Sequence, residues 1–397
     1  MTDVTAARFA AAARAAVPRF LALEVLAAAG ERQRTHGDLL NLAAGQPYTP
    51  PSTPVIEAAR RALDDRRLSY TVAPGIPELR EAIAGHYAAW YPGLGVTPED
   101  VMVTTGSSGG FLATFLAAFD VGDRVAMARP SYPCYRNILA ALGCEVVDLP
   151  CGPAERWQPT VAVLEALERP IDGLVIASPA NPTGTMLAAG ELAAIAAWCE
   201  ANGVRLISDE LYHGVSFDGA PPASVWHTSR SAVVVNSFSK YFSMTGWRLG
   251  WLLVPEELRR PVEGLIGNFS ICAPTLSQLA GVAAFTPESH AELAGHVERY
   301  RRNRDVLLDG LAALGITRIA PADGAFYVWA DLSHRTADTL DWCRRLLAAT
   351  GVALGPGVDF DPVDGSRHVR ISFGGEPADI RGALDRLNTW LESADGI

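Results

Sequence analysis

The chain has 397 residues, of which 49% are hydrophobic and 19% are charged, a composition typical of a soluble globular protein large enough for more than one domain. Its formal net charge is −11 and it contains no block of basic residues, so we expect no nucleic-acid partner. The cysteines and histidines lack metal-site spacing, and no apolar run reaches the ~18 residues of a membrane span, so we expect a cytoplasmic protein with no metal site and no membrane partner.

The N-terminal stretch has Arg8, Arg14 and Arg19 among alanines, a pattern that organelle transit peptides share. It also contains Asp3 and no serine, and an apolar run follows Pro18. These features favour an ordinary helix over a targeting peptide.

Between residues 100 and 255, short apolar runs alternate with helical stretches such as 111–119 and 188–201. The runs are continuously apolar, as expected of strands that are covered on both faces. This alternation predicts an α/β fold whose large domain has a mostly parallel, seven-stranded sheet flanked by helices. The predicted strands are 101–105, 124–128, 145–149, 173–177, 204–208, 232–236 and 250–254.

The later part of the chain has a different pattern. A long helix rich in Arg and Glu is expected at 287–314, followed by a strand at 324–329, more helix, a strand at 369–373 and a final helix. This order predicts a smaller α+β domain that the N-terminal segment completes. The predicted division is 1–50 for that N-terminal segment, 51–285 for the large domain and 286–397 for the rest of the small domain.

Polar residues follow several of the predicted strands. A Gly- and Ser-rich loop at 106–110 lies between a strand and a helix, where backbone N–H groups can bind an anion. Asn181, Asp209 and Lys240 follow three further strands. Because ligands of open α/β sheets bind beyond the carboxyl ends of the strands, we expect these groups to share one site.

Lys240 is the one lysine among the 33 Lys and Arg residues of the chain. A guanidinium does not lose its proton in a protein, whereas an amine with a lowered pKa can act as a nucleophile or base. The chemistry that needs such an amine is imine formation with the carbonyl of a substrate or of pyridoxal phosphate. Lys240 is therefore the first candidate for a catalytic residue.

Five short motifs follow one another along the chain. In this order and spacing they resemble the class I/II aminotransferases, pyridoxal phosphate enzymes of fold type I, from about residue 40 to the C-terminus. The resemblance implies that the large domain at 51–285 binds the cofactor. The motifs are Asn-Pro-Thr-Gly at 181–184, Ser-Asp-Glu-x-Tyr at 208–212, Ser-Phe-Ser-Lys at 237–240, Gly-Trp-Arg-Leu-Gly at 246–250 and Arg-Ile-Ser-Phe at 370–373.

The resemblance implies a role for each residue of the catalytic group. Lys240 would hold pyridoxal phosphate as an aldimine and, once a substrate amine displaces it, would move a proton between the substrate Cα and the cofactor. Asp209 would pair with the pyridine nitrogen, so that the protonated ring can accept electrons from Cα. Asn181 and Tyr212 would hydrogen-bond the phenolic oxygen of the ring.

The resemblance also implies how the rest of the cofactor is held. N–H groups at a helix start, a hydroxyl and a guanidinium would bind the phosphate, and a tyrosine would stack on the ring. These residues are Ser107, Ser108, Gly109, Ser237 and Arg248 for the phosphate and Tyr132 for the ring. Tyr70 matches a tyrosine that reaches the phosphate of the neighbouring subunit, so a homodimer with shared active sites is expected.

Further matches concern the substrate. Arg370 matches the arginine that grips the α-carboxylate with its planar fork, and Gly45 matches a glycine whose backbone approaches the same group. Asn181 and Tyr48 are also expected to contact the substrate. Tyr48 is bulky where smaller or acidic residues are more usual, and the stretch 267–272 offers no arginine for a distal carboxylate. We therefore expect a neutral, aromatic or unusual amino acid as substrate in preference to a dicarboxylate.

Together these residues predict an aminotransferase that moves an amino group between an α-amino acid and a 2-oxo acid by a ping-pong mechanism. The same cofactor chemistry also fits a lyase or a β/γ-replacement enzyme that acts on an activated amino acid, for example in specialised metabolism. A ligand-sensing regulator would need a DNA-binding domain, for which we find neither room ahead of residue 40 nor a basic helix. A lysine-dependent aldolase without pyridoxal phosphate would be colourless, whereas an enzyme that contains this cofactor should be yellow.

Overall fold

The structure is a computed structural model, and it describes residues 11–18, 21–65, 68–217 and 222–393. A short 3-10 helix, η1 (Ala13–Ala15), contains Arg14 and precedes α2 (Leu21–His36), which is the helix expected after Pro18. The remaining charged residues of the N-terminal stretch, Asp3, Arg8 and Arg19, lie outside the described residues.

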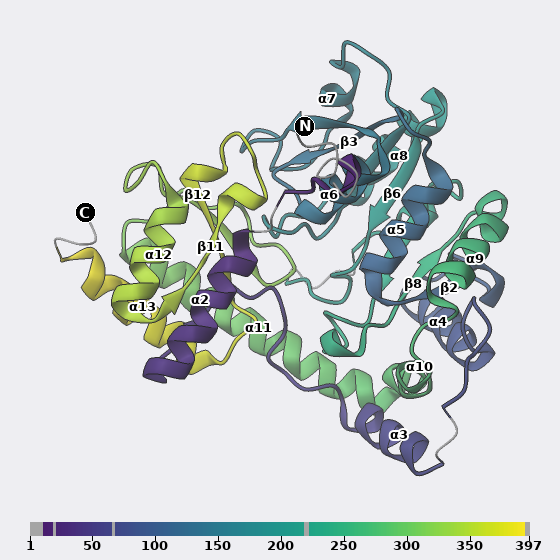
Figure 1. The fold of residues 1–397 in the computed structure, drawn as a ribbon, viewed down its shortest axis with the longest axis horizontal. Helices are drawn as coiled ribbons and strands as arrows, with labels where there is room; N and C mark the ends of the chain where they lie inside the picture. Colours follow the sequence, from purple (N-terminus) through teal and green to yellow (C-terminus); the bar gives the residue numbers. More distant parts are fainter. Residues whose placement is uncertain (1–10, 19–20, 66–67, 218–221, 394–397) are drawn as a thin grey trace, which may run out of the picture.

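A seven-stranded sheet forms the centre of the larger part of the molecule (Figure 1). Its strands lie in the order β2-β8-β7-β6-β5-β3-β4, and neighbours are parallel except that β8 runs antiparallel to β2 and β7. The predicted α/β fold with a mostly parallel sheet is confirmed, and the strand ends lie within one residue of the predicted ones. The strands are β2 (Val101–Thr104), β3 (Arg124–Arg129), β4 (Glu145–Pro150), β5 (Gly173–Ala177), β6 (Arg205–Asp209), β7 (Val233–Ser237) and β8 (Gly250–Leu253).

Helices cover both faces of this sheet, which is why its strands are apolar throughout. Alternate residues of one strand point to opposite faces: Val235 of β7 packs with α5, α6 and α9, whereas Val234 packs in the cluster that contains α4, α8 and α10. The helix expected at 111–119 begins earlier, because the Gly- and Ser-rich loop itself forms the first turn of α5. The helices of this part are α3 (Thr53–Asp64), α4 (Pro77–Trp90), α5 (Gly106–Ala118), α6 (Pro133–Leu142), α7 (Val161–Glu165), α8 (Ala189–Asn202), α9 (Glu256–Ser270) and α10 (Thr275–Val282).

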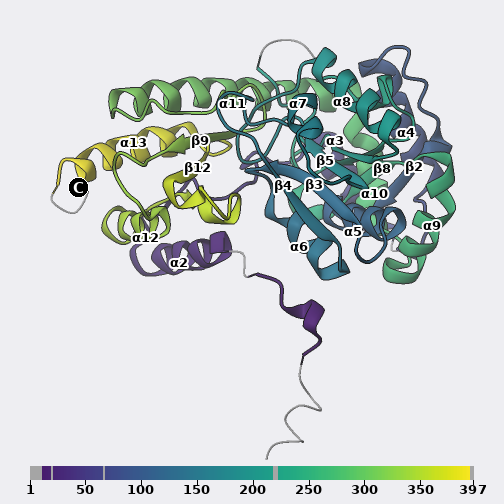
Figure 2. The same ribbon diagram turned by 90° about the horizontal axis from the view of Figure 1, so that it is seen from above.

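The smaller part combines both ends of the described chain. β1 (Leu40–Asn41) pairs in parallel with β10 (Val352–Ala353), and Val25 of α2 packs against Leu347. A second, antiparallel sheet has the order β11-β12-β9. The long helix α11 runs from beside α13 to beside α3 and α10 in the larger part (Figures 1 and 2). The further elements are β9 (Tyr327–Asp331), β11 (Gly355–Pro356), β12 (His368–Ser372), α11 (Pro287–Ala313), α12 (Thr339–Thr350) and α13 (Pro377–Leu391).

The strand expected at 324–329 begins only at Tyr327, so that prediction is wrong at its start. Ala325 has a φ of 56°, in the left-handed region, and Gly324 forms only an isolated bridge with Ser216. A left-handed residue interrupts the regular pairing of a strand. The domain division at residues 50 and 285 stays a prediction.

The described residues contain neither a membrane-spanning helix nor a group of side chains that could bind a metal ion. None of their helices has the length and apolar character needed to cross a membrane. The same residues contain no group of His, Cys, Asp and Glu side chains that could hold a metal ion.

Candidate active site

A cavity of about 240 Å³ lies at the carboxyl ends of the strands of the large sheet, with β9 and β12 of the smaller part beside it. Side chains from both parts of the molecule therefore meet there. Ten of the residues singled out in the sequence line this cavity: Gly45, Ser107, Ser108, Tyr132, Asn181, Asp209, Tyr212, Lys240, Arg248 and Arg370.

Four other predicted residues lie outside this lining. Gly109 lies one turn into α5. Ser237 is buried at the end of β7, where its Oγ lies within hydrogen-bonding distance of Ser239 Oγ, at 2.8 Å, and of Leu249 O, at 3.1 Å. Tyr48 is 38% exposed and Tyr70 is 79% exposed. The fold of one chain therefore does not bring Tyr48 and Tyr70 to the cavity.

Lys240 is partly buried beside the backbone of the chain segment before α3. Its Nζ donates a hydrogen bond of 2.5 Å to the carbonyl of Gly45. Burial lowers the pKa of Lys240 to about 7, and the charges of Arg370 and Arg248 lower it further, while Asp209 opposes them. Near neutral pH, a large fraction of this amine is unprotonated and able to act as a nucleophile or base.

Asp209, the last residue of β6, is also buried. One carboxylate oxygen accepts a hydrogen bond of 3.0 Å from the Leu211 backbone N–H, and the other accepts one from the Tyr135 hydroxyl. Burial raises the pKa of Asp209 to about 6, although both hydrogen bonds and the charge of Lys240 lower it. A carboxylate in this position is stabilised by any cation that enters the cavity beside it.

Arg370 on β12 lies between two aromatic rings, with its guanidinium carbon 4.5 Å from the centre of Tyr327 and 4.7 Å from that of Phe360. Its Nη1 donates to Asn181 Oδ1 at 3.0 Å and its Nη2 to the Ala43 carbonyl at 2.7 Å. The buried Nε has no hydrogen-bond partner among the described residues. The guanidinium is thus held in one plane, and the Nη hydrogens that these two bonds do not use remain for a further acceptor, such as a carboxylate.

The first turn of α5 and Arg248 form a second group of donors. Gly106 has a φ of 67°, and a Cβ on this residue would lie 2.6 Å from Nη2 of Arg248. Glycine therefore allows the guanidinium to lie against the start of the helix, where the N–H groups of the first turn have no partner within the helix. This arrangement suits a dianion such as a phosphate.

The cavity residues that the sequence singled out, from Gly45 to Arg370, lie within the range matched by one family model. Residues 37–387 match the family model for aminotransferase class I and II. The chain belongs to the class I and II aminotransferases. It therefore moves an amino group between an amino acid and a 2-oxo acid, and the lyase, regulator and aldolase alternatives are set aside.

Named relatives of this aminotransferase cover nearly all of it. The valine–pyruvate aminotransferase of Mycobacterium tuberculosis is 61% identical over 96% of this chain and 98% of its own. The aspartate/prephenate aminotransferase of Thermus thermophilus is 36% identical over 91% of this chain and 94% of its own. Among solved structures, an aminotransferase from Mycobacterium tuberculosis has a TM-score of 0.93 at 60% identity, covering 96% of this chain and 99% of that one.

The aminotransferase cavity also contains residues that the sequence did not single out. Tyr135, Tyr327, Ser239, Thr245 and Leu26 all line it. Tyr135 could have been found, because it lies in the first turn of α6, three residues after Tyr132 at the N-cap of that helix, and so near the same strand end. Leu26 of α2 has no such signal, because only the packing of α2 against the smaller part brings it to the cavity.

Proposed function

We propose that this aminotransferase uses pyridoxal phosphate and that the cavity residues hold it. The donor set fits this group. The buried Asp209 has a raised pKa, which the charge of Lys240 opposes, so a further cation beside it would stabilise its carboxylate. The glycine at 106 leaves Arg248 beside the first turn of α5. When bound, pyridoxal phosphate supplies an aldehyde that exchanges amines and a protonated ring that withdraws electrons from the substrate Cα.

The proposed contacts of the chain follow from the chemistry of each group. Asp209 would keep the pyridine nitrogen protonated, and Asn181 and Tyr212 would hydrogen-bond the phenolic oxygen. Tyr132 would stack on the ring. The phosphate would be bound by Ser107, Ser108, Gly109, Ser237 and Arg248, with Tyr70 supplied by a second subunit.

Lys240 is the proposed catalytic acid and base. Its lowered pKa would allow the amine to take a proton from the substrate Cα and to deliver it to the carbon of the cofactor to which the amino group becomes attached. Arg370 would bind the α-carboxylate through its remaining Nη hydrogens, with the backbone of Gly45 close by. This geometry orients Cα toward Lys240.

We infer a neutral aliphatic amino donor. Within the part of the chain that the structure describes, the cations of the cavity lining are Lys240, Arg248 and Arg370, and the proposed contacts occupy all three. None is left for a distal carboxylate, whereas Leu26 and Ala43 add apolar surface. The 61% identity to a valine–pyruvate aminotransferase supports valine as donor and pyruvate as acceptor.

We also propose a cytoplasmic homodimer. Tyr70, Val72, Phe269 and Ile271 are exposed large hydrophobic residues, between 49% and 79% accessible. Their two segments are joined by a 2.6 Å hydrogen bond from the Thr275 hydroxyl to the Ser69 carbonyl. Exposed apolar residues on two segments joined in this way support a protein interface, and a second copy would bring Tyr70 toward the neighbouring cavity.

The proposed function can be tested with purified protein, valine and pyruvate. We expect alanine and the 2-oxo acid of valine in equal amounts, a yellow cofactor that borohydride bleaches, and kcat/KM for aspartate lower by about 100-fold. Lys240→Arg keeps the positive charge but replaces the amine with a guanidinium, which does not give up its proton. The variant should therefore lower kcat by at least about 1,000-fold. Absence of the cofactor, or wild-type turnover by Lys240→Arg, would refute the mechanism; equal use of aspartate would refute the substrate class alone.

A further inference from the structure

One short segment of the smaller part, residues 359–364, touches several structures that border the catalytic cavity. We call it the clasp. Asp359 Oδ1 accepts a hydrogen bond of 2.8 Å from the backbone N–H of Leu21, at the start of α2. The ring of Phe360 lies against the guanidinium of Arg370. The clasp therefore contacts both the helix that carries Leu26 and the proposed carboxylate-binding residue.

The clasp also contacts the loop that follows β3, beside Tyr132. The carbonyl of Phe360 accepts a hydrogen bond of 3.0 Å from the backbone N–H of Ser131. Ser131 directly precedes Tyr132, the residue proposed to stack on the cofactor ring. Three walls of the cavity, each from a distant part of the sequence, thus meet at the same few residues.

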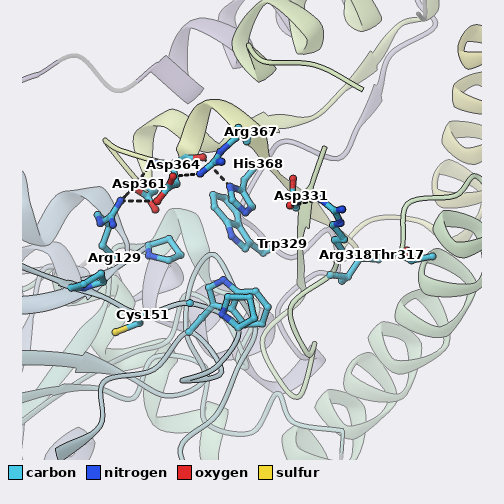
Figure 3. Close-up of a pocket in the computed structure, with 16 residues that line it drawn as sticks. Arg129, Cys151, Thr317, Arg318, Trp329, Asp331, Asp361, Asp364, Arg367 and His368 are labelled. Carbon is cyan, nitrogen blue, oxygen red and sulfur yellow. Dashed lines mark hydrogen bonds and ion pairs between the residues drawn. The ribbon is translucent and has the colours of Figure 1, made fainter. Parts of the chain in front are cut away.

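Arg129, the last residue of β3, joins the clasp to the large sheet by ion pairs. Its Nη1 lies 2.9 Å from Asp361 Oδ1 and 3.1 Å from Asp364 Oδ2, and the side chains of Arg129 and Asp361 are only 14% and 6% exposed. Figure 3 shows Arg129 facing the two carboxylates across the edge of a separate pocket. Because the pair is largely buried, salt screens it weakly, and removing one partner leaves the other charge buried.

Internal contacts make the clasp rigid, so its ion pair with Arg129 restrains the whole segment. Asp361 Oδ1 accepts hydrogen bonds from the backbone N–H groups of Val363 at 2.9 Å and Asp364 at 3.0 Å, so the same carboxylate fixes the turn and binds Arg129. At the start of the turn, a Cβ on Gly357 would lie 2.5 Å from the carbonyls of Gly365 and His368. Little room remains for the clasp to move independently of Arg129.

We propose that the Arg129–Asp361 pair is a latch that positions the substrate-binding walls of the cavity, holding α2, the loop at Tyr132 and Arg370 in register. Arg129 does not line the catalytic cavity, so it acts as a positioning residue. The proposal deepens the proposed function and rests on it, because the role of Arg370 in binding the α-carboxylate is taken from there.

The test compares Arg129→Met with a matched control, Arg259→Met, in the holoenzyme. Arg259 pairs with Asp100 at 2.5 Å, and Asp100 is 9% exposed, but this pair lies within the larger part and away from the cavity. Both variants leave one buried carboxylate without its arginine, so both should lose thermal stability. Only the latch variant should change substrate binding.

For Arg129→Met we expect KM for the amino donor and the oxo acid to rise about tenfold, with kcat changed less than about twofold, because positioning for binding is lost while the reacting groups remain. Hydrogen exchange should become faster at residues 21–36 and 357–372. Arg129→Lys, which keeps a positive charge but not the planar guanidinium, should have a KM between those of Arg129→Met and the wild type. Arg259→Met should leave KM and the exchange of both segments at wild-type values.

The proposal is overturned if Arg129→Met keeps the wild-type KM, or if both arginine variants change KM and exchange alike. Failure of the proposed function would be seen differently, as absence of turnover in the wild-type protein. Hydrogen exchange still reports on the latch in that case, because it needs no substrate: unchanged exchange at residues 21–36 in Arg129→Met would overturn the latch by itself.

Discussion

The hydroxyl groups of Tyr212 and Tyr327 lie 2.7 Å apart, and the ring of Tyr327 also lies under the guanidinium of Arg370. One residue therefore touches both the proposed partner of the cofactor ring and the proposed partner of the substrate carboxylate. Burial raises the pKa of both phenols, so both stay protonated at neutral pH and one donates to the other. Tyr327 can thus hold Tyr212 in the orientation that its proposed contact requires.

Tyr327→Phe tests this relationship, because it removes the hydroxyl but keeps the ring beneath Arg370. Loss of one buried hydrogen bond, about 1 kcal/mol, should lower kcat/KM by roughly five- to tenfold. The pH titration of the bound cofactor's absorbance should also shift, since Tyr212 loses its partner. Tyr300→Phe is the control: its hydroxyl bonds Thr49 at 2.6 Å, away from the cavity lining. Identical titrations in the two variants would contradict the assignment.

The sequence predicted the sheet and most of the cavity because both depend on local signals. Continuous apolar runs mark strands covered on both faces, and the parallel order then carries Asn181, Asp209 and Lys240 to one edge. Tyr327 was not predicted, because its contacts with Tyr212 and Arg370 depend on how the small sheet docks on the large one. That docking leaves no periodic pattern in the sequence.

Asp209→Asn should change the pH dependence of stability in the cofactor-free protein. The pKa of Asp209 is about 6 in the folded state against an ordinary value of 3.8. Below about pH 4 the carboxyl is protonated in both the folded and unfolded states; between pH 4 and 6 only the unfolded state ionises, so folding weakens as the pH rises, and above pH 6 the penalty is constant at about 3 kcal/mol. The asparagine variant lacks this penalty.

We therefore expect the melting temperature of Asp209→Asn to equal that of the wild type near pH 4 and to exceed it increasingly up to pH 6, as measured by calorimetry. Glu210→Gln is the comparison, because burial raises the pKa of Glu210 to about 8, and its advantage should keep growing up to that pH. A difference for Asp209→Asn that does not vary with pH would contradict the raised pKa. With pyridoxal phosphate bound, the proposed pairing reverses the sign, and the variant should bind the cofactor more weakly.

Gly106→Ala tests the proposed phosphate site. The new Cβ would lie 2.6 Å from Arg248 Nη2, so the flexible arginine must leave the start of α5, and cofactor affinity should fall about tenfold or more. The left-handed backbone adds a stability loss of roughly 1–2 kcal/mol. Gly122→Ala separates the two effects, since Gly122 has a φ of 94° with nothing within 4 Å of its Cβ position. Similar melting temperatures but different cofactor titrations are expected; equal titrations would exclude Arg248 from the phosphate site.

Leu26→Ala tests whether α2 contributes to substrate selection. Leu26 lines the cavity although α2 belongs to the smaller part, and it is the apolar side chain that the helix presents there. Shortening Leu26 should remove contact with a branched substrate side chain, so kcat/KM for valine should fall about tenfold. The value for alanine should stay nearly constant, because its side chain is too short to reach Leu26.

Leu23→Ala is the matched control, since Leu23 lies on the same helix but is 58% exposed. Alanine favours the helix as well as leucine does, so neither variant should unfold α2. If kcat/KM falls equally for valine and alanine in Leu26→Ala, the side chain supports the site without selecting the substrate. The preference for neutral substrates would then come only from the lack of a further cation beyond Lys240, Arg248 and Arg370 in the described cavity lining.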